Sequence, residues 1–167
     1  FVEKGLRGGI SMISHRYAQA NNPYTPNHNE SEPNSYISYL DANNLYGWAM
    51  KQPLPISDFE WLPVTSGLTI DTLIDQYGGQ HDSTKGCIVE VDLEYPQSLH
   101  DLHSDYPLAP EAKTVTNDML SPYARELQAK LNITADTTPK LVPNLNNKTS
   151  YVADIRNIAY YLQQGMR

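Results

Sequence analysis

The sequence predicts an α+β fold, and three patterns lead to this prediction. Residues 87–95 alternate apolar and acidic side chains, as a half-exposed strand does. Residues 36–41 form a second short run rich in strand-favouring side chains. A third pattern, an apolar stripe at helical spacing, predicts a terminal helix and consists of Ile155, Ile158, Ala159 and Leu162. With 167 residues and 40% hydrophobic content, the chain can form one domain with a modest core.

The first part of the chain adds one strand, one loop and one short helix. Residues 8–14 alternate weakly after a glycine pair and predict a strand. Residues 21–35 are rich in Asn, Pro and Ser, which is typical of an exposed loop. Residues 43–51 show helical spacing, and Pro53 ends that pattern, so a short helix is expected there.

The later elements follow from the same kinds of pattern. A helix is expected at 69–77, where four apolar residues share one face and Gly78-Gly79 closes the run. Further expected elements are a proline-spotted loop at 96–118, a helix at 121–131, and strands at 139–145 and 148–153. We expect one antiparallel sheet, in which 36–41 pairs with 8–14 and with a strand from 86–95 or 139–153.

The charge of the chain is uneven. The net charge is -7, but residues 1–29 carry +2, residues 140–167 carry +3, and the segment between them carries -12. Weakly basic flanks around an acidic middle are not a DNA-binding footprint by themselves. They do not exclude one, because an acidic metal site is locally negative.

The compartment follows from what the sequence lacks. No apolar stretch approaches the length of a membrane span, and no signal peptide is visible. A single cysteine, Cys87, allows no internal disulfide and is expected in the core. We therefore expect the nucleus or the cytoplasm of a host cell. Both ends look cut, so a piece of a longer polypeptide is expected.

The end of the 36–41 run is unusual because it delivers a carboxylate. Asp41 is costly to bury unpaired, and a divalent cation beside it would remove that cost. The turn that follows, Asn43-Asn44, can expose backbone amides that suit a phosphate. The alternative is a strand, an Asx-turn and a capped helix, with Asp41 solvated or acting as the cap.

Two other acidic or histidine clusters have simpler explanations. His100 and His103 have the spacing of a metal-binding pair, but prolines bracket the stretch and a polar, hydrogen-bonded loop is favoured. Glu90, Asp92 and Glu94 are expected to be the solvent-facing side of a strand. Most of the twelve tyrosines are expected to be core or rim residues.

The stretch around Asp41 resembles a known motif. The sequence DANNLYG, residues 41–47, is similar to motif A of family B DNA polymerases, usually D-x-x-S-L-Y-P, with Asn for Ser and Gly for Pro. YLDANNLYGWAMKQPLP is similar to protein-primed polymerases of Polinton/Maverick-type mobile elements and related viruses. RGG, residues 7–9, resembles the Y-x-G-G element that precedes motif A, with Leu6 for Tyr. Two later stretches resemble the segment between motifs A and B, namely VDLEYPQSLHDLHSDYPLAPE and KLVPNLNNKTSYVADIRNIAYYLQQGM. The resemblance therefore covers nearly the whole chain.

The resemblance implies a palm subdomain that transfers nucleotides with two Mg2+ ions, or Mn2+ in their place, as cofactors. Asp41 would be the catalytic carboxylate and bind both ions, and the Ala42 carbonyl would help to bind one. Backbone amides around the following turn would hold the incoming triphosphate. The nucleotide-binding residues implied are Ala42, Asn43, Asn44, Leu45 and Tyr46.

The resemblance also assigns a sugar contact and a DNA contact. Tyr46 would lie under the sugar as a steric gate against a 2′-hydroxyl. Arg7, Gly8 and Gly9 would lie along the template strand. Arg7 would contact a phosphate, and the two glycines would let the backbone approach the DNA.

The implied architecture is an antiparallel palm-type sheet with flanking helices and an inserted subdomain between motifs A and B. Residues 1–167 would be a partial palm domain, and residues 56–140 an insertion that contacts a terminal protein priming synthesis. The expected partners are template-primer DNA, dNTP and that terminal protein, with no membrane. Motif B (K-x-x-x-N-S-x-Y-G) and motif C (Y-x-D-T-D) do not occur, so this chain alone is expected to be inactive. The second hypothesis is a non-catalytic relic or a docking module built on residues 56–140.

Overall fold

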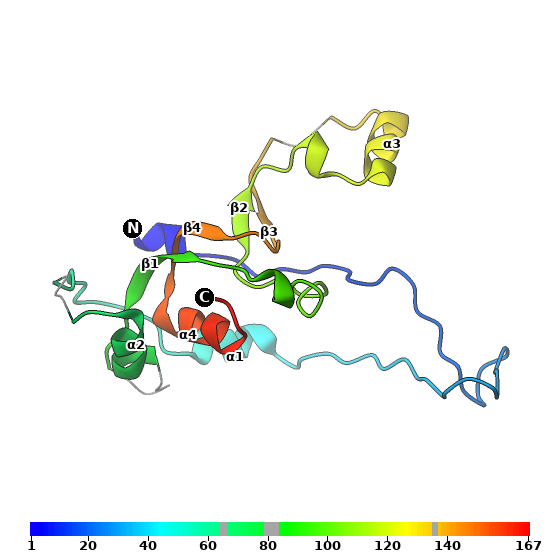
Figure 1. The fold of residues 1–167 in the computed structure, drawn as a ribbon, viewed down its shortest axis with the longest axis horizontal. Helices are drawn as coiled ribbons and strands as arrows, with labels where there is room; N and C mark the ends of the chain where they lie inside the picture. Colours follow the sequence, from blue (N-terminus) through cyan, green and yellow to red (C-terminus); the bar gives the residue numbers. More distant parts are fainter. Residues whose placement is uncertain (64–66, 79–83, 135–136) are drawn as a thin grey trace.

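The computed structural model describes residues 1–63, 67–78, 84–134 and 137–167. Their fold is α+β, as the sequence predicts, with two small two-stranded antiparallel sheets and four α-helices in the described part (Figure 1). The helices are α1 (Leu45–Lys51), α2 (Ile70–Leu73), which a π-helical turn (Ile74–Gly78) continues, α3 (Pro122–Leu131) and α4 (Ile155–Gln163). The strands are β1 (Ile88–Leu93), β2 (Glu111–Lys113), β3 (Lys140–Val142) and β4 (Lys148–Asp154).

The central sheet pairs β1 with β4. The strands are antiparallel, with Ile88 opposite Asp154 and Val91 opposite Tyr151. The predicted alternation of β1 is confirmed: Leu93 is buried, whereas the three acidic side chains of this stretch are exposed. A bulge interrupts the register between Val91 and Leu93. The strands predicted at 87–95 and 148–153 are therefore present and pair with each other.

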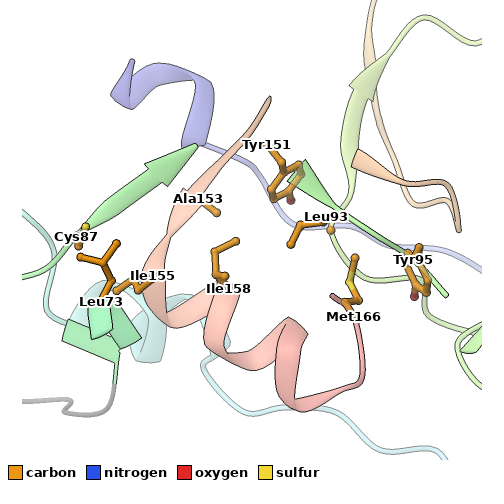
Figure 2. Close-up of a cluster of buried hydrophobic side chains, with 10 residues drawn as sticks. Leu73, Cys87, Leu93, Tyr95, Tyr151, Ala153, Ile155, Ile158 and Met166 are labelled. Atoms are coloured by element: carbon orange, nitrogen blue, oxygen red, sulfur yellow. The ribbon is translucent and has the colours of Figure 1, made fainter. Parts of the chain in front are cut away.

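Helix α4 covers one face of this sheet. Its apolar stripe buries Ile155 and Ile158, which are 0% and 1% exposed, against Ala153 of β4 and Leu73 at the end of α2 (Figure 2). Burial of each isoleucine side chain contributes about 1.5–3 kcal/mol. Asp154 begins the helix by accepting the Arg156 amide at 2.9 Å. The predicted helix and its packing face are confirmed.

The second sheet is a short hairpin that carries α3. Glu111 of β2 lies opposite Val142 of β3, and α3 lies at the far end of the hairpin, away from the central sheet (Figure 1). We call β2, α3 and β3 together the α3 arm. The helix predicted at 121–131 is confirmed, and the strand predicted at 139–145 is confirmed in a shorter form. Strand β2 was missed, because three residues inside a proline-rich stretch are too few to show a period.

The strands predicted at 8–14 and 36–41 are wrong. Both segments lack strand pairing, and Ile37 and Tyr39 are 64% and 92% exposed. Their strand-favouring residues have no neighbouring edge in the described chain, and an unpaired strand gains no cross-strand contacts. The expected sheet with 36–41 between 8–14 and a later strand is therefore replaced by direct pairing of β1 with β4.

A long segment connects the N-terminal turn to α1. Residues 8–44 run through the loop predicted at 21–35, which is confirmed, and reach α1 (Figure 1). Two asparagines close that loop: Asn22 Nδ2 donates to the Ser35 carbonyl at 3.0 Å, and the Asn29 amide donates to Asn21 Oδ1 at 2.8 Å. The long segment is thus held at its tip by local polar contacts.

Candidate functional site

The turn before α1 is built on Asn44. This residue adopts the left-handed conformation with φ 51° and ψ 45°, which asparagine tolerates better than most residues. Its Oδ1 accepts the Gly47 amide at 3.2 Å, and its carbonyl accepts the Trp48 amide at 3.0 Å. Asn44 therefore caps the helix with its side chain and begins it with its backbone. The predicted short helix is confirmed. The alternative in which Asp41 acts as the cap is wrong, because Asn44 is the cap and Asp41 is exposed to solvent.

The glycine at position 47 belongs to this turn. A Cβ atom at Gly47 would lie 2.5–2.7 Å from the side-chain atoms of Asn44, a separation that real Cβ atoms do not adopt. A side chain at residue 47 would therefore require the Asn44 side chain to move from this position. The two departures from the D-x-x-S-L-Y-P pattern thus contact each other in the same turn.

The predicted nucleotide-binding residues are accessible. Asp41, Ala42, Asn43 and Asn44 are exposed, and the Tyr46 side chain is 84% exposed. Within the described residues, no group of three or more His, Cys, Asp or Glu side chains is arranged to hold a metal ion. Asp41 can therefore offer one carboxylate, and a two-metal site needs additional acidic ligands.

These residues lie within a continuous stretch of exposed apolar side chains. We call residues 36–62 the apolar arm. No apolar side chain in it is buried, and an uncovered apolar surface of this kind is typical of an interaction surface. Its large apolar members are Tyr36, Ile37, Tyr39, Leu40, Leu45, Tyr46, Trp48, Met50, Leu54, Ile56, Phe59, Trp61 and Leu62. At its end, the Trp61 ring lies 5.3 Å from the ring of Phe1.

The predicted DNA-binding residues lie elsewhere. Arg7 is half-buried against β4, whereas Gly8 and Gly9 are exposed and have open space around them. The hydrogen bonds and ring contacts of the described residues join Arg7 to β4 and do not join residues 7–9 to residues 41–46. No such contact among the described residues therefore joins the predicted DNA-binding residues to the predicted nucleotide-binding residues.

A charged cluster that sequence analysis missed connects the α3 arm to the central sheet. The Lys148 side chain is completely buried. Its Nζ lies 3.3 Å from Glu111 Oε2 and donates a hydrogen bond to the Asn144 carbonyl at 3.1 Å. Glu111 Oε2 also accepts Asn144 Nδ2 at 2.9 Å and lies 3.2 Å from Lys113 Nζ. We call these four residues the Lys148 cluster. A lysine at an inward position of a strand is the sequence signal that could have identified it.

The two charges of the cluster respond differently to burial. Burial by itself would raise the pKa of Glu111, but the hydrogen bonds from Asn144 and Lys113 and the charge of Lys148 hold this pKa below its usual value. Burial lowers the pKa of Lys148, and the Glu111 carboxylate opposes that shift only in part. Both pKa values are therefore lowered: at Glu111 the polar and charged partners outweigh burial, whereas at Lys148, whose side chain is wholly inside, burial outweighs the Glu111 carboxylate.

The histidine pair belongs to a polar network around Tyr95. The Tyr95 hydroxyl accepts the Leu108 amide at 3.2 Å and lies 2.8 Å from Nδ1 of the buried His103. His100 Nε2 lies 3.4 Å from the Tyr95 carbonyl oxygen. Both histidines therefore belong to a hydrogen-bonded loop, and the interpretation that the sequence favoured is confirmed.

The prediction that Cys87 is a core residue is also confirmed. Burial raises the pKa of its thiol, and the nearby Asp154 carboxylate raises it to a smaller extent.

Comparison with known proteins gives no match: no protein family, no curated protein and no solved structure matches this chain. In the described parts of the chain, no helix has the length and apolar character needed to cross a membrane.

Proposed function

We propose that this chain is part of the palm of a protein-primed family B DNA polymerase and carries the motif A half of its nucleotidyl-transfer site. The observation that carries the proposal is the turn at residues 41–46. It offers a carboxylate, a left-handed asparagine and an aromatic side chain, all exposed, within an apolar arm that the described chain leaves uncovered. The resemblance of residues 41–47 to motif A supports the same assignment.

The palm-type fold of the proposal requires residues 36–41 to pair as a strand with partners from beyond the described chain. Residues 36–41 have the composition of a core strand but lack a partner within the described chain. Strands from a longer polypeptide would cover their apolar side chains and complete an antiparallel palm sheet. In this arrangement residues 56–140 would be an insertion, and the protruding α3 arm would lie near a protein that primes synthesis.

The chemistry assigned to the chain's own residues is limited to binding and orientation. Mg2+, or Mn2+ in its place, would supply the charge that neutralises the phosphates of the nucleotide. Asp41 would provide an oxygen ligand, with the Ala42 carbonyl beside it, and further carboxylates would have to come from beyond the described residues. The amides of Asn43, Asn44 and Leu45 precede the first intrahelical bonds of α1 and would face the triphosphate.

Tyr46 would select the sugar. Its ring is 84% exposed on the first turn of α1, so it is accessible to a bound nucleotide. A ring under the sugar excludes a 2′-hydroxyl by size, whereas a deoxyribose fits. A smaller side chain at this position should favour ribonucleotides over deoxynucleotides, because it relieves a clash only for ribonucleotides.

The proposal is tested by Tyr46→Val in the intact enzyme. The ratio of ribo- to deoxynucleotide incorporation should rise at least about tenfold, which corresponds to about 1.4 kcal/mol of lost discrimination. The matched control is Tyr24→Val, which changes a tyrosine that is 89% exposed in the 21–35 loop. Because Tyr46 is exposed, the stability of the 167-residue chain should change by less than about 0.5 kcal/mol. An unchanged incorporation ratio would contradict the gate.

A non-catalytic docking module is the second candidate. The observation that favours it is the exposed apolar surface of the α3 arm, which includes Tyr123, Leu127 and Leu131 at successive turns of α3. A docking module predicts that Tyr46→Val leaves every nucleotide-dependent measurement unchanged and that partner binding depends on α3. The sugar-selectivity experiment therefore separates the two candidates.

A further inference from the structure

The N-terminal residues cover the face of β4 opposite α4. The first turn, Val2–Gly5, is a 3-10 helix that packs against β4. Val152 is 1% exposed although it does not belong to the core beneath α4, because Gly5 lies directly against it. A Cβ at Gly5 would lie 3.3 Å from Val152 Cγ1 and 3.6 Å from the Val152 carbonyl oxygen. This close approach shows that the segment is packed on the strand.

Arg7 ends this packed segment with three contacts. Its Nη1 donates to the Val152 carbonyl at 2.6 Å and to the Gly5 carbonyl at 3.3 Å. Its guanidinium carbon lies 3.9 Å from the centre of the Tyr151 ring, a cation–π distance. Tyr151 is 4% exposed and belongs to the central core. Arg7 therefore connects the N-terminal segment to the backbone of Val152 and to the side chain of the preceding residue, Tyr151.

The two residues after Arg7 have no such contacts. A Cβ at Gly8 or Gly9 would meet no atom within 4 Å, and both residues are exposed. The boundary between the packed segment and the open glycines thus falls at Arg7. The position of the glycines relative to the sheet depends on the arginine that precedes them.

We propose that Arg7 is a positioning residue that anchors residues 1–7 on β4 and fixes the start of the Gly8-Gly9 loop, and that it is not a phosphate contact. The template role of the loop rests on the proposed function, whereas the anchor rests on the contacts of this chain. The Val152 carbonyl and the Tyr151 ring already engage Nη1 and one face of the guanidinium. Lysine cannot replace the anchor, because its ammonium lacks the planar surface that stacks on an aromatic ring.

The anchor is tested on the 167-residue chain by amide hydrogen exchange. The Lys4 and Leu6 amides donate to the Phe1 and Glu3 carbonyls in the N-terminal turn, so they report its release. Arg7→Ala and Arg7→Lys should both accelerate their exchange at least about tenfold while β1 keeps its protection. The control is Arg16→Ala, an exposed arginine outside the packed segment, which should change neither. Unchanged exchange in both Arg7 variants would overturn the anchor.

The second measurement separates positioning from DNA contact. In the intact enzyme, removal of one phosphate contact lowers the slope of log K against log salt by about 0.7 for single-stranded DNA and about 0.9 for duplex. We expect Arg7→Ala to leave this slope unchanged, as Arg16→Ala does, while binding itself weakens. A slope reduced by about 0.7 or more in Arg7→Ala alone would overturn the proposal. If the enzyme binds no DNA, the proposed function fails, and the exchange experiment still decides the anchor.

Discussion

The Lys148 cluster predicts an asymmetry between its two charges. Glu111→Gln keeps the shape of the side chain but leaves the ammonium of Lys148 completely buried without a counter-ion. Loss of one partner of a buried ion pair costs about 3–5 kcal/mol, and we expect about 3 kcal/mol here because two Asn144 oxygens still accept from Lys148. Lys148→Met removes the more deeply buried charge. Glu111 then keeps Lys113, Asn144 and partial exposure, so this variant should cost only about 1–2 kcal/mol.

The assay is urea unfolding of the wild type, both single variants and the double variant. The double variant should cost no more than Lys148→Met alone, which gives a coupling of about 3 kcal/mol or more between the two sites. Lys113→Met is the matched control, because its side chain is 35% exposed and such pairs contribute less than about 1 kcal/mol. Equal costs for Glu111→Gln and Lys148→Met, or costs that simply add, would refute the reasoning.

The remaining stability predictions concern acid and the core. The folded pKa of Glu111 lies below its ordinary value of 4.5, so its contribution to stability is present above about pH 4.5 and is lost as the pH falls through the folded pKa. Urea titrations of wild type and Glu111→Gln should therefore converge at low pH, and a constant gap would contradict this. Ile158→Ala should lower the free energy of unfolding by about 2–5 kcal/mol, because Ile158 is 1% exposed on the buried face of α4. Leu40→Ala, at an 89% exposed position, should change it by less than about 0.5 kcal/mol, and similar costs for both would show that the core lies elsewhere.

Short-range patterns predicted the two strands of the central sheet and its helix, but not the pairing of the strands, because the residues that carry each pattern are also the residues that are buried. The alternation along β1 and the stripe of α4 each lie within one element, and these elements pack against each other. The turn at Asn44 was predictable for a similar reason, since an asparagine cap needs only its own neighbours.

The rest depended on contacts between distant residues. Residues 36–41 carry as good a strand pattern as β1, but a strand needs an edge to pair with, and no edge of the described chain is adjacent. The Lys148 cluster forms because the hairpin of β2 and β3 brings Glu111 beside the start of β4. The contact between Arg7 and Tyr151 also joins opposite ends of the chain. Composition and period contain no information on such pairings.

The most direct test of the proposed function is template-directed nucleotide incorporation by the intact enzyme with Asp41→Asn. The substitution keeps the shape of an exposed side chain and removes the charge assigned to metal binding. Asp58→Asn is the matched control, an exposed aspartate in the same arm whose positive φ of 58° asparagine also tolerates. We predict that Asp41→Asn lowers incorporation at least about a thousandfold, equivalent to about 4 kcal/mol, while DNA binding persists and Asp58→Asn stays near wild type. Equal activity of the two variants would contradict the assignment of Asp41 and, with it, the polymerase proposal.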